Sequence, residues 1–250
     1  MARWHLWLAL GTLSLLTACQ PPSTVDSSSA ANSTDAAEPV TNAQADNGQS
    51  PSEPDDATKS DDLPTPLTDT TVVPGDRVGP VTADTSRADL AAQFGESALK
   101  DTEVAVGEGF TESGTIVNAG SEQTFAVIWV DESQSEPATV KDFGAAWETP
   151  EGIGIGTPLV ELQQILGPFD LYGFGWDYGG TLVLEGSNLS QYYGALILRL
   201  QPADPAAPQQ QAEAFTAVLG DKLIASDNPN LAELDLVVDE MIVYIDPPME

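Results

Sequence analysis

Cysteine, histidine and basic side chains are scarce in this 250-residue chain. The single histidine and the single cysteine, His5 and Cys19, both lie in the first 19 positions. If that segment is processed, the mature chain has no histidine and no free thiol. This excludes Ser-His-Asp and Cys-His catalysis, thiolate or imidazole zinc sites, and disulfides. Eight Lys and Arg residues against 39 Asp and Glu residues give a net charge of −31, which excludes a nucleic-acid surface.

The N-terminal segment has no apolar run long enough to cross a membrane. Its run from Leu6 to Leu16 follows a basic residue at Arg3 and precedes small residues. A membrane-spanning helix needs about 20 apolar residues, so this run is typical of the central region of a secretory signal peptide. We therefore predict a signal peptide over residues 1–18.

The tetrad Leu16-Thr17-Ala18-Cys19 resembles the lipobox of bacterial lipoproteins. The resemblance implies that residues 1–18 are removed and that Cys19 is acylated, so that the lipid bilayer is a partner of the chain. Two or three acyl chains on one residue suffice for stable anchoring. In this family Asp after the cysteine directs retention in the inner membrane. Gln20 therefore favours the outer membrane. The alternative is an ordinary secretory signal with a chance cysteine.

Aromatic residues are absent from Gln20 to Gln93. Residues 20–84 are rich in Ser, Thr, Ala, Asp, Pro and Asn, and their 12 acidic and two basic residues give a net charge of −10. Such a composition cannot bury enough apolar area to offset the entropy lost on ordering. We predict a disordered acidic tether over residues 19–84, acting either as a spacer from the membrane or as a stalk without a partner.

The remaining residues, 85–250, have the length and the aromatic content of one α+β domain. Capping residues, proline in a first turn and C-terminal glycines predict helices at 85–95, 157–167 and 208–219. Alternating or β-branched residues predict antiparallel strands at 114–117, 124–130, 169–174, 181–184, 195–200 and 241–245.

The first two predicted helices align at a constant offset of 72 residues. Thr85 corresponds to Thr157 at their starts, and Gly95 corresponds to Gly167 at their ends. We expect two helix-plus-antiparallel-meander units in tandem, over residues 85–150 and 152–202, followed by a C-terminal helix and strand. The alternative is chance, because many short helices share these capping residues.

The second unit carries the pattern Gly152-Ile-Gly-Ile-Gly-Thr-Pro158, then Leu162, then Leu166-Gly-Pro168. This pattern resembles the repeats of the β-lactamase inhibitor protein family and of small SmpA/OmlA-type outer-membrane lipoproteins. In those families a residue separates the last glycine from the proline, and here none does. The resemblance implies a helix followed by a β-meander, and binding of other proteins through the sheet face and loops. It implies no catalytic residues.

Aromatic residues alternate along Tyr172, Phe174, Trp176 and Tyr178, so as a strand they would share one face. One interpretation is a core strand followed by a tight turn at Gly179 and Gly180. The other is a stacking platform for a glycan or a peptide, formed by Tyr172, Trp176 and Tyr178, with Asp177 as a hydrogen-bond acceptor.

Carboxylates could also support catalysis or calcium binding. The pairs with suitable residue types are Asp170 with Asp177 and Glu148 with Glu151, and the calcium candidate is Asp227-Asn-Pro-Asn230. The candidate calcium turn lacks the central glycine of an EF-hand and is equally typical of an ordinary turn. We therefore predict no catalytic residue, metal or cofactor.

The leading functional hypothesis is a non-enzymatic module that binds another cell-envelope protein. The alternatives are a carboxylate-based glycan hydrolase, a glycan- or calcium-binding module, and a purely structural spacer.

Overall fold

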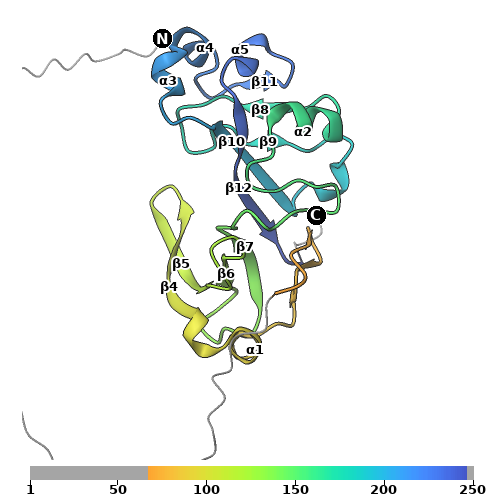
Figure 1. The fold of residues 1–250 in the computed structure, drawn as a ribbon, viewed down its shortest axis with the longest axis vertical. Helices are drawn as coiled ribbons and strands as arrows, with labels where there is room; N and C mark the ends of the chain where they lie inside the picture. Colours follow the sequence, from red (N-terminus) through yellow and green to blue (C-terminus); the bar gives the residue numbers. More distant parts are fainter. Residues whose placement is uncertain (1–66, 247–250) are drawn as a thin grey trace, which may run out of the picture. The chain divides into compact units, whose positions relative to one another are not determined.

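The computed structural model describes residues 67–246 (Figure 1). The predicted signal peptide, the predicted lipidation site Cys19 and the part of the predicted tether up to residue 66 lie outside the described residues. Among residues 67–246, no helix combines the length and the apolar character needed to cross a bilayer.

The largest sheet has six antiparallel strands in the order β10-β12-β7-β6-β5-β4. Its strands are β4 (Leu99–Gly107), β5 (Phe110–Val117), β6 (Phe125–Trp129), β7 (Pro137–Lys141), β10 (Leu196–Pro202) and β12 (Leu236–Tyr244). Strands β4 to β7 follow one another as a meander. Strand β12, from the end of the chain, lies between β7 and β10 and so joins the two halves of the sheet (Figure 1).

Two three-stranded antiparallel sheets accompany the large one, in the orders β1-β2-β3 and β11-β8-β9. Their strands are β1 (Val72–Val73), β2 (Arg77–Val78), β3 (Val81–Thr82), β8 (Asp170–Tyr172), β9 (Leu182–Val183) and β11 (Leu223–Ala225). The helices are α1 (Arg87–Phe94), α2 (Leu159–Leu166), α3 (Ala207–Gln210), α4 (Ala212–Ala217) and α5 (Pro229–Ala232), with single 3₁₀ turns η1 (Glu96–Ala98) and η2 (Ser190–Tyr192). Helices with antiparallel sheets confirm the α+β class.

Helix α1 forms where its capping residues predict it. The Ser86 side chain accepts a hydrogen bond from the Asp89 backbone N–H, and the Asp89 carboxylate accepts one from the Ser86 N–H, so two otherwise unpaired donors are satisfied. The helix buries Leu90 and Phe94 and ends at Gly95, whose φ of +81° favours glycine. The predicted second helix forms as α2, which buries Leu159, Leu162 and Leu166.

The two faces of the large sheet differ in what covers them. Along β6, Phe125, Val127 and Trp129 point into the main core together with residues of α1 and α2. The alternate residues, Ala126 and Ile128, pack instead against side chains of β4 and β5. We call this second side of the sheet, which carries Val104, Ile116, Ala126 and Ile128, the strand-covered face.

The strands β1 to β3 correct the predicted tether boundary at residue 84. Val72, Val78 and Val81 are fully buried in the main core, so the domain includes residues assigned to the tether. Gly79 shows how closely this sheet packs, because a Cβ there would lie 2.9 Å from the ring of Trp147. The apolar surface that buries these valines comes from residues distant in the sequence, which composition alone does not reveal.

Several predicted elements have different bounds in the structure. The helix predicted at 208–219 is two short helices, α3 and α4, separated at Gln211, whose ψ of 45° interrupts the helix. The strand predicted at 241–245 is the longer β12. Six strands were not predicted: β1, β2 and β3 in the segment assigned to the tether, and β4, β7 and β11 in the predicted domain.

Candidate functional site

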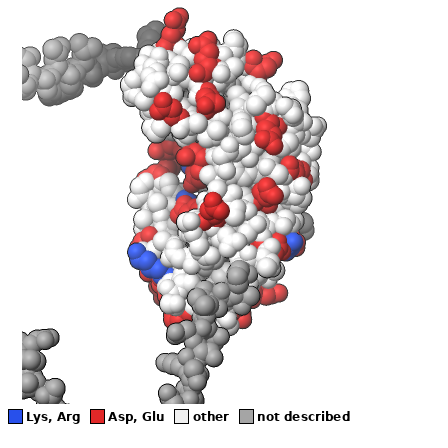
Figure 2. Space-filling view, viewed as in Figure 1, with Lys and Arg blue, Asp and Glu red and all other residues white. Residues whose placement is uncertain are grey.

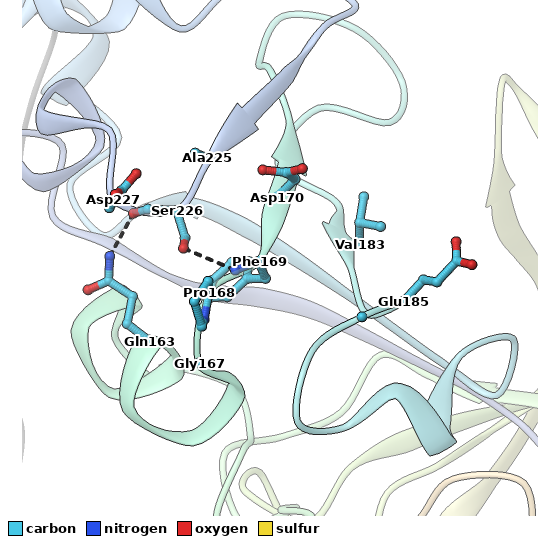
Figure 3. Close-up of a pocket in the computed structure, with 11 residues that line it drawn as sticks. Gln163, Gly167, Pro168, Phe169, Asp170, Val183, Glu185, Ala225, Ser226 and Asp227 are labelled. Carbon is cyan, nitrogen blue, oxygen red and sulfur yellow. Dashed lines mark hydrogen bonds between the residues drawn. The ribbon is translucent and has the colours of Figure 1, made fainter.

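An open cavity of about 600 Å³ lies beside α2 (Figure 3). Its walls come from the end of α2, the start of β8, the segment after β9 and the end of β11. Gln163 Nε2 donates to the Ser226 carbonyl over 2.6 Å, and the Phe169 N–H donates to Ser226 Oγ over 3.3 Å. These bonds join the α2, β8 and β11 walls.

The charged residues that line this cavity are all acidic: Asp170, Glu185 and Asp227. Figure 3 shows their carboxylates at separate points around the hollow, on three different segments. Within residues 67–246, no three His, Cys, Asp or Glu side chains gather where they could hold a metal ion. The cavity can attract cations, but its carboxylates do not converge on one point.

A second candidate site is formed by the hairpin of β4 and β5. Glu108 and Gly109 make its two-residue turn, both with positive φ, as a type I′ turn requires. Only Gly114–Val117 of β5 pairs with β6, so the outer part of the hairpin projects beyond the sheet (Figure 1). Lys141 on β7 donates from Nζ to the Ala105 carbonyl on β4 over 2.8 Å. Strands β5 and β6 lie between β7 and β4 in the sheet. A direct contact between β7 and β4 therefore requires the sheet to curl toward its strand-covered face.

The hairpin tip and the loop after β8 enclose a small cleft of about 130 Å³. We call it the hairpin cleft, and its lining residues are Val106, Gly107, Glu108, Phe110, Asp177, Tyr178 and Arg199. Figure 2 shows a hollow beside the hairpin in which acidic groups surround small basic patches. Three large apolar side chains at the cleft are exposed: Phe110 by 66%, Tyr178 by 44% and Val106 by 37%. Three exposed apolar groups around one hollow make the hairpin cleft a candidate binding surface.

The basic groups near the floor of the cleft are already paired. Arg199 Nη1 lies 2.7 Å from a Glu240 carboxylate oxygen, and its Nε donates to Thr181 Oγ1 over 3.1 Å. Lys141 Nζ lies 3.1 Å from the other Glu240 oxygen. Two cations thus share one half-buried carboxylate, which fixes β7, β10 and β12 relative to one another.

Tyr178 connects the two sides of the cleft. Its hydroxyl donates to Glu108 Oε1 over 2.7 Å, between residues 70 positions apart in the chain. This hydrogen bond stabilises the neutral phenol and the carboxylate repels the phenolate, so the pKa of Tyr178 lies above its usual value. Asp177 adds to the rise, and Arg199 opposes it.

Substituting Glu108→Gln is expected to lower the pKa of Tyr178 toward its usual value, because the carboxylate that disfavours the phenolate is removed. Titration of the Tyr178 ring followed by NMR measures the change, with Tyr178→Phe to assign the signal. A Tyr178 pKa that does not fall in Glu108→Gln would mean that the hydrogen bond does not form in solution.

The structure places the predicted aromatic platform differently from the expected strand. Tyr172, Trp176 and Tyr178 do gather, with ring centroids 5.7 Å and 5.2 Å apart in edge-to-face contacts. Phe174 points elsewhere and packs against Phe215. The expectation of one shared face is wrong because the strand ends at Tyr172 and the chain then turns.

The members of the candidate carboxylate pairs do not line a common hollow of the two described above. Asp170 lines the large cavity whereas Asp177 lines the hairpin cleft, so the two carboxylates face different hollows. Glu148 is exposed, and Glu151 accepts a hydrogen bond from Tyr192 over 3.1 Å. Neither of these glutamates lines either hollow.

The candidate calcium turn has a structural role in the fold. The Asn228 side chain accepts a hydrogen bond from the Asn230 N–H over 3.0 Å and caps α5. Asn228 therefore serves as an ordinary helix N-cap.

Sequence reasoning found Asp177 and Tyr178 but missed Glu108, Phe110 and Arg199. Glu108 and Phe110 could have been found from the sequence Gly107-Glu-Gly109, which stands between two runs of strand-forming residues and is therefore a hairpin pattern. Nothing local marks Arg199 as facing the cleft.

Compared with protein-family models, curated proteins and solved structures, the chain matches none of them. Its function is therefore inferred from its own residues and geometry.

Proposed function

We propose that this chain is a lipid-anchored protein of the bacterial cell envelope whose folded domain is a non-enzymatic module for binding another envelope protein. The observation that carries the proposal is the projecting β4–β5 hairpin, whose tip holds Phe110 exposed above a cleft. Exposed aromatic residues beside a hollow are the usual anchors of protein interfaces.

The proposed anchor rests on the N-terminal sequence. A short apolar run precedes Leu16-Thr17-Ala18-Cys19, and an acidic, aromatic-free segment follows it. Acylation of Cys19 would hold the chain on a membrane, and Gln20 favours the outer membrane over the inner one. The segment up to residue 66 would then act as the tether.

We also propose that the domain contains two related units, and the helices support this. Helix α2 has the bounds of α1 shifted by 72 residues at both ends. The turns before the helices match as well. Thr85 Oγ1 accepts from the Thr82 N–H, and Thr157 Oγ1 accepts from the Gly154 N–H, each over 2.9 Å. The matched turns and the matched helix lengths support a duplication more strongly than the cap residues alone do.

The strands support the same proposal. Shifted by 72 residues, β6 falls within β10, and β4 and β5 overlap β8 and β9. This order of a helix and then antiparallel strands is the one implied by the resemblance to β-lactamase inhibitor protein-like and SmpA/OmlA-like repeats. Proteins of those families bind through sheet faces and loops, and the hairpin cleft lies at such a place in this chain.

Photo-crosslinking in cells tests the proposal on the full chain. A photoreactive phenylalanine analogue at Phe110 should give a discrete crosslinked product with another envelope protein. Tyr193 is the matched control, because it is exposed to a similar extent, 61%, and does not line the cleft.

Equal products from positions 110 and 193 would indicate nonspecific contact. No protein product from position 110 in a membrane-localised chain would contradict the proposed module.

A further inference from the structure

Resting on that proposed function, we propose that the hairpin cleft binds a basic segment of the partner protein, in which a lysine or arginine lies next to an apolar side chain. The cation would lie between the carboxylates of Glu108 and Asp177, and the apolar side chain would pack on Phe110 and Val106.

The carboxylates at the cleft lack cationic partners. Among residues 67–246, no ion pair includes Glu108, Glu112 or Asp177. Glu112 lies directly opposite Val104 in the hairpin register, so both side chains are on the strand-covered face. Two carboxylates that line the cleft, Glu108 and Asp177, are therefore without an ion-pair partner in the described part of the chain, and Glu112 lies farther along β5 on the strand-covered face.

The nearby bases cannot neutralise these acids. Arg199 and Lys141 are both committed to Glu240, and Lys141 also donates to a β4 carbonyl. Lys100 lies at the other end of β4, eight residues from Glu108, which is roughly 26 Å along an extended strand. A positive charge from outside the chain is thus the complement that the cleft lacks.

The apolar part of the cleft fits a side chain rather than a large ligand. Its volume of about 130 Å³ corresponds to roughly four water molecules, enough for one long side chain. The exposed ring of Tyr178 can also attract a cation through its face. An aliphatic or aromatic neighbour of that cation would cover Phe110.

A glycan is the less suitable occupant. Sugar rings stack on flat aromatic faces, but Trp176 meets Tyr172 at 78° and Tyr178 at 66°. The three rings pack on one another edge to face and so offer no common plane.

Peptide binding by the purified, detergent-solubilised full chain tests the partner chemistry. The probes are fluorescent Gly-Leu-Lys-Leu-Lys-Leu-Gly and versions with Gln or Glu in place of Lys. The Lys peptide is expected to bind at least tenfold more tightly than the Gln peptide and to weaken between 50 and 500 mM salt, because exposed charges are screened. Equal binding of the Lys and Gln peptides, or no binding, would overturn the proposal.

Two double variants, each of which removes two negative charges from the chain, test whether the peptide binds at the cleft. Glu108→Gln with Asp177→Asn is expected to weaken Lys-peptide binding at least tenfold, and Phe110→Ser to weaken it severalfold. The control is Glu161→Gln with Glu213→Gln, two exposed residues on α2 and α4. Circular dichroism confirms that each variant is folded. Equal losses in the two double variants would show that overall charge attracts the peptide and would overturn the cleft assignment.

The two proposals can fail separately. A protein crosslink at Phe110 without Lys-peptide binding would leave the interaction module standing and reject its basic partner. Binding of a neutral N-acetylglucosamine tetrasaccharide that competes with the Phe110 crosslink and does not depend on salt would instead assign the cleft to glycan.

Discussion

Replacing Trp147 by alanine is expected to lower the free energy of unfolding by about 3–5 kcal/mol, the largest loss from any single core residue of the domain. The Trp147 side chain is fully buried. Its ring packs edge-on against Phe125, with centroids 5.0 Å apart, and lies 5.8 Å from Phe143. Its truncation would leave a large cavity among rigid neighbours, which cannot collapse to fill it.

Trp147 also holds the β1–β3 sheet against the rest of the domain. The ring touches Gly79 in the turn between β2 and β3, and the Val72 N–H donates to the Glu148 carbonyl over 2.8 Å beside it. The indole N–H makes no hydrogen bond among the described residues. The loss on substitution therefore comes from packing, and Trp147→Phe should retain a large part of the stability.

Urea denaturation followed by far-UV circular dichroism measures the effect. Trp176→Ala is the matched control, because the same residue type there is only partly buried and lies in a loop. Its expected loss is about 1 kcal/mol. Equal losses for the two tryptophans would contradict the assignment of Trp147 to the centre of the core.

The elements that could be predicted from the sequence are those specified by residues close together in the chain. Helix α1 follows from the capping pair Ser86 and Asp89 and from Gly95, all within ten residues. Strand β6 follows from a run of apolar residues. In contrast, β1 to β3 are only two residues long each, and their valines are buried against residues that include Trp147, more than 60 positions away.

The candidate site divides in the same way. The density of aromatic residues around Asp177 and Tyr178 is a local signal, so that side of the cleft could be predicted. The opposite side is brought to it by the fold, as the hydrogen bond between Tyr178 and Glu108 shows. The charged residues of β4 also obscured the hairpin, because a strand that projects into solvent does not need a buried face.

Substituting Cys19→Ser is expected to move the protein from the membrane fraction to the soluble fraction almost completely. Acyl chains contribute about 0.8 kcal/mol per buried CH₂ group, and two chains hold a protein stably where one does not. Without the cysteine there is no thiol to acylate, since Cys19 is the single cysteine of the chain. Fractionation and incorporation of labelled palmitate measure the two consequences independently.

An uncleaved signal peptide could also retain the variant at the membrane, so a second chain is needed. In it, a cleavable secretory signal replaces residues 1–18 and serine stands at position 19. We expect this chain to be soluble and free of palmitate, because the acidic segment and the domain supply no other anchor in the proposed arrangement. If it stays on the membrane while the native chain takes up no palmitate, the lipobox interpretation is wrong. The membrane contact would then have to come from the folded domain, and its exposed apolar residues, Phe110 among them, would be the first to test against lipid.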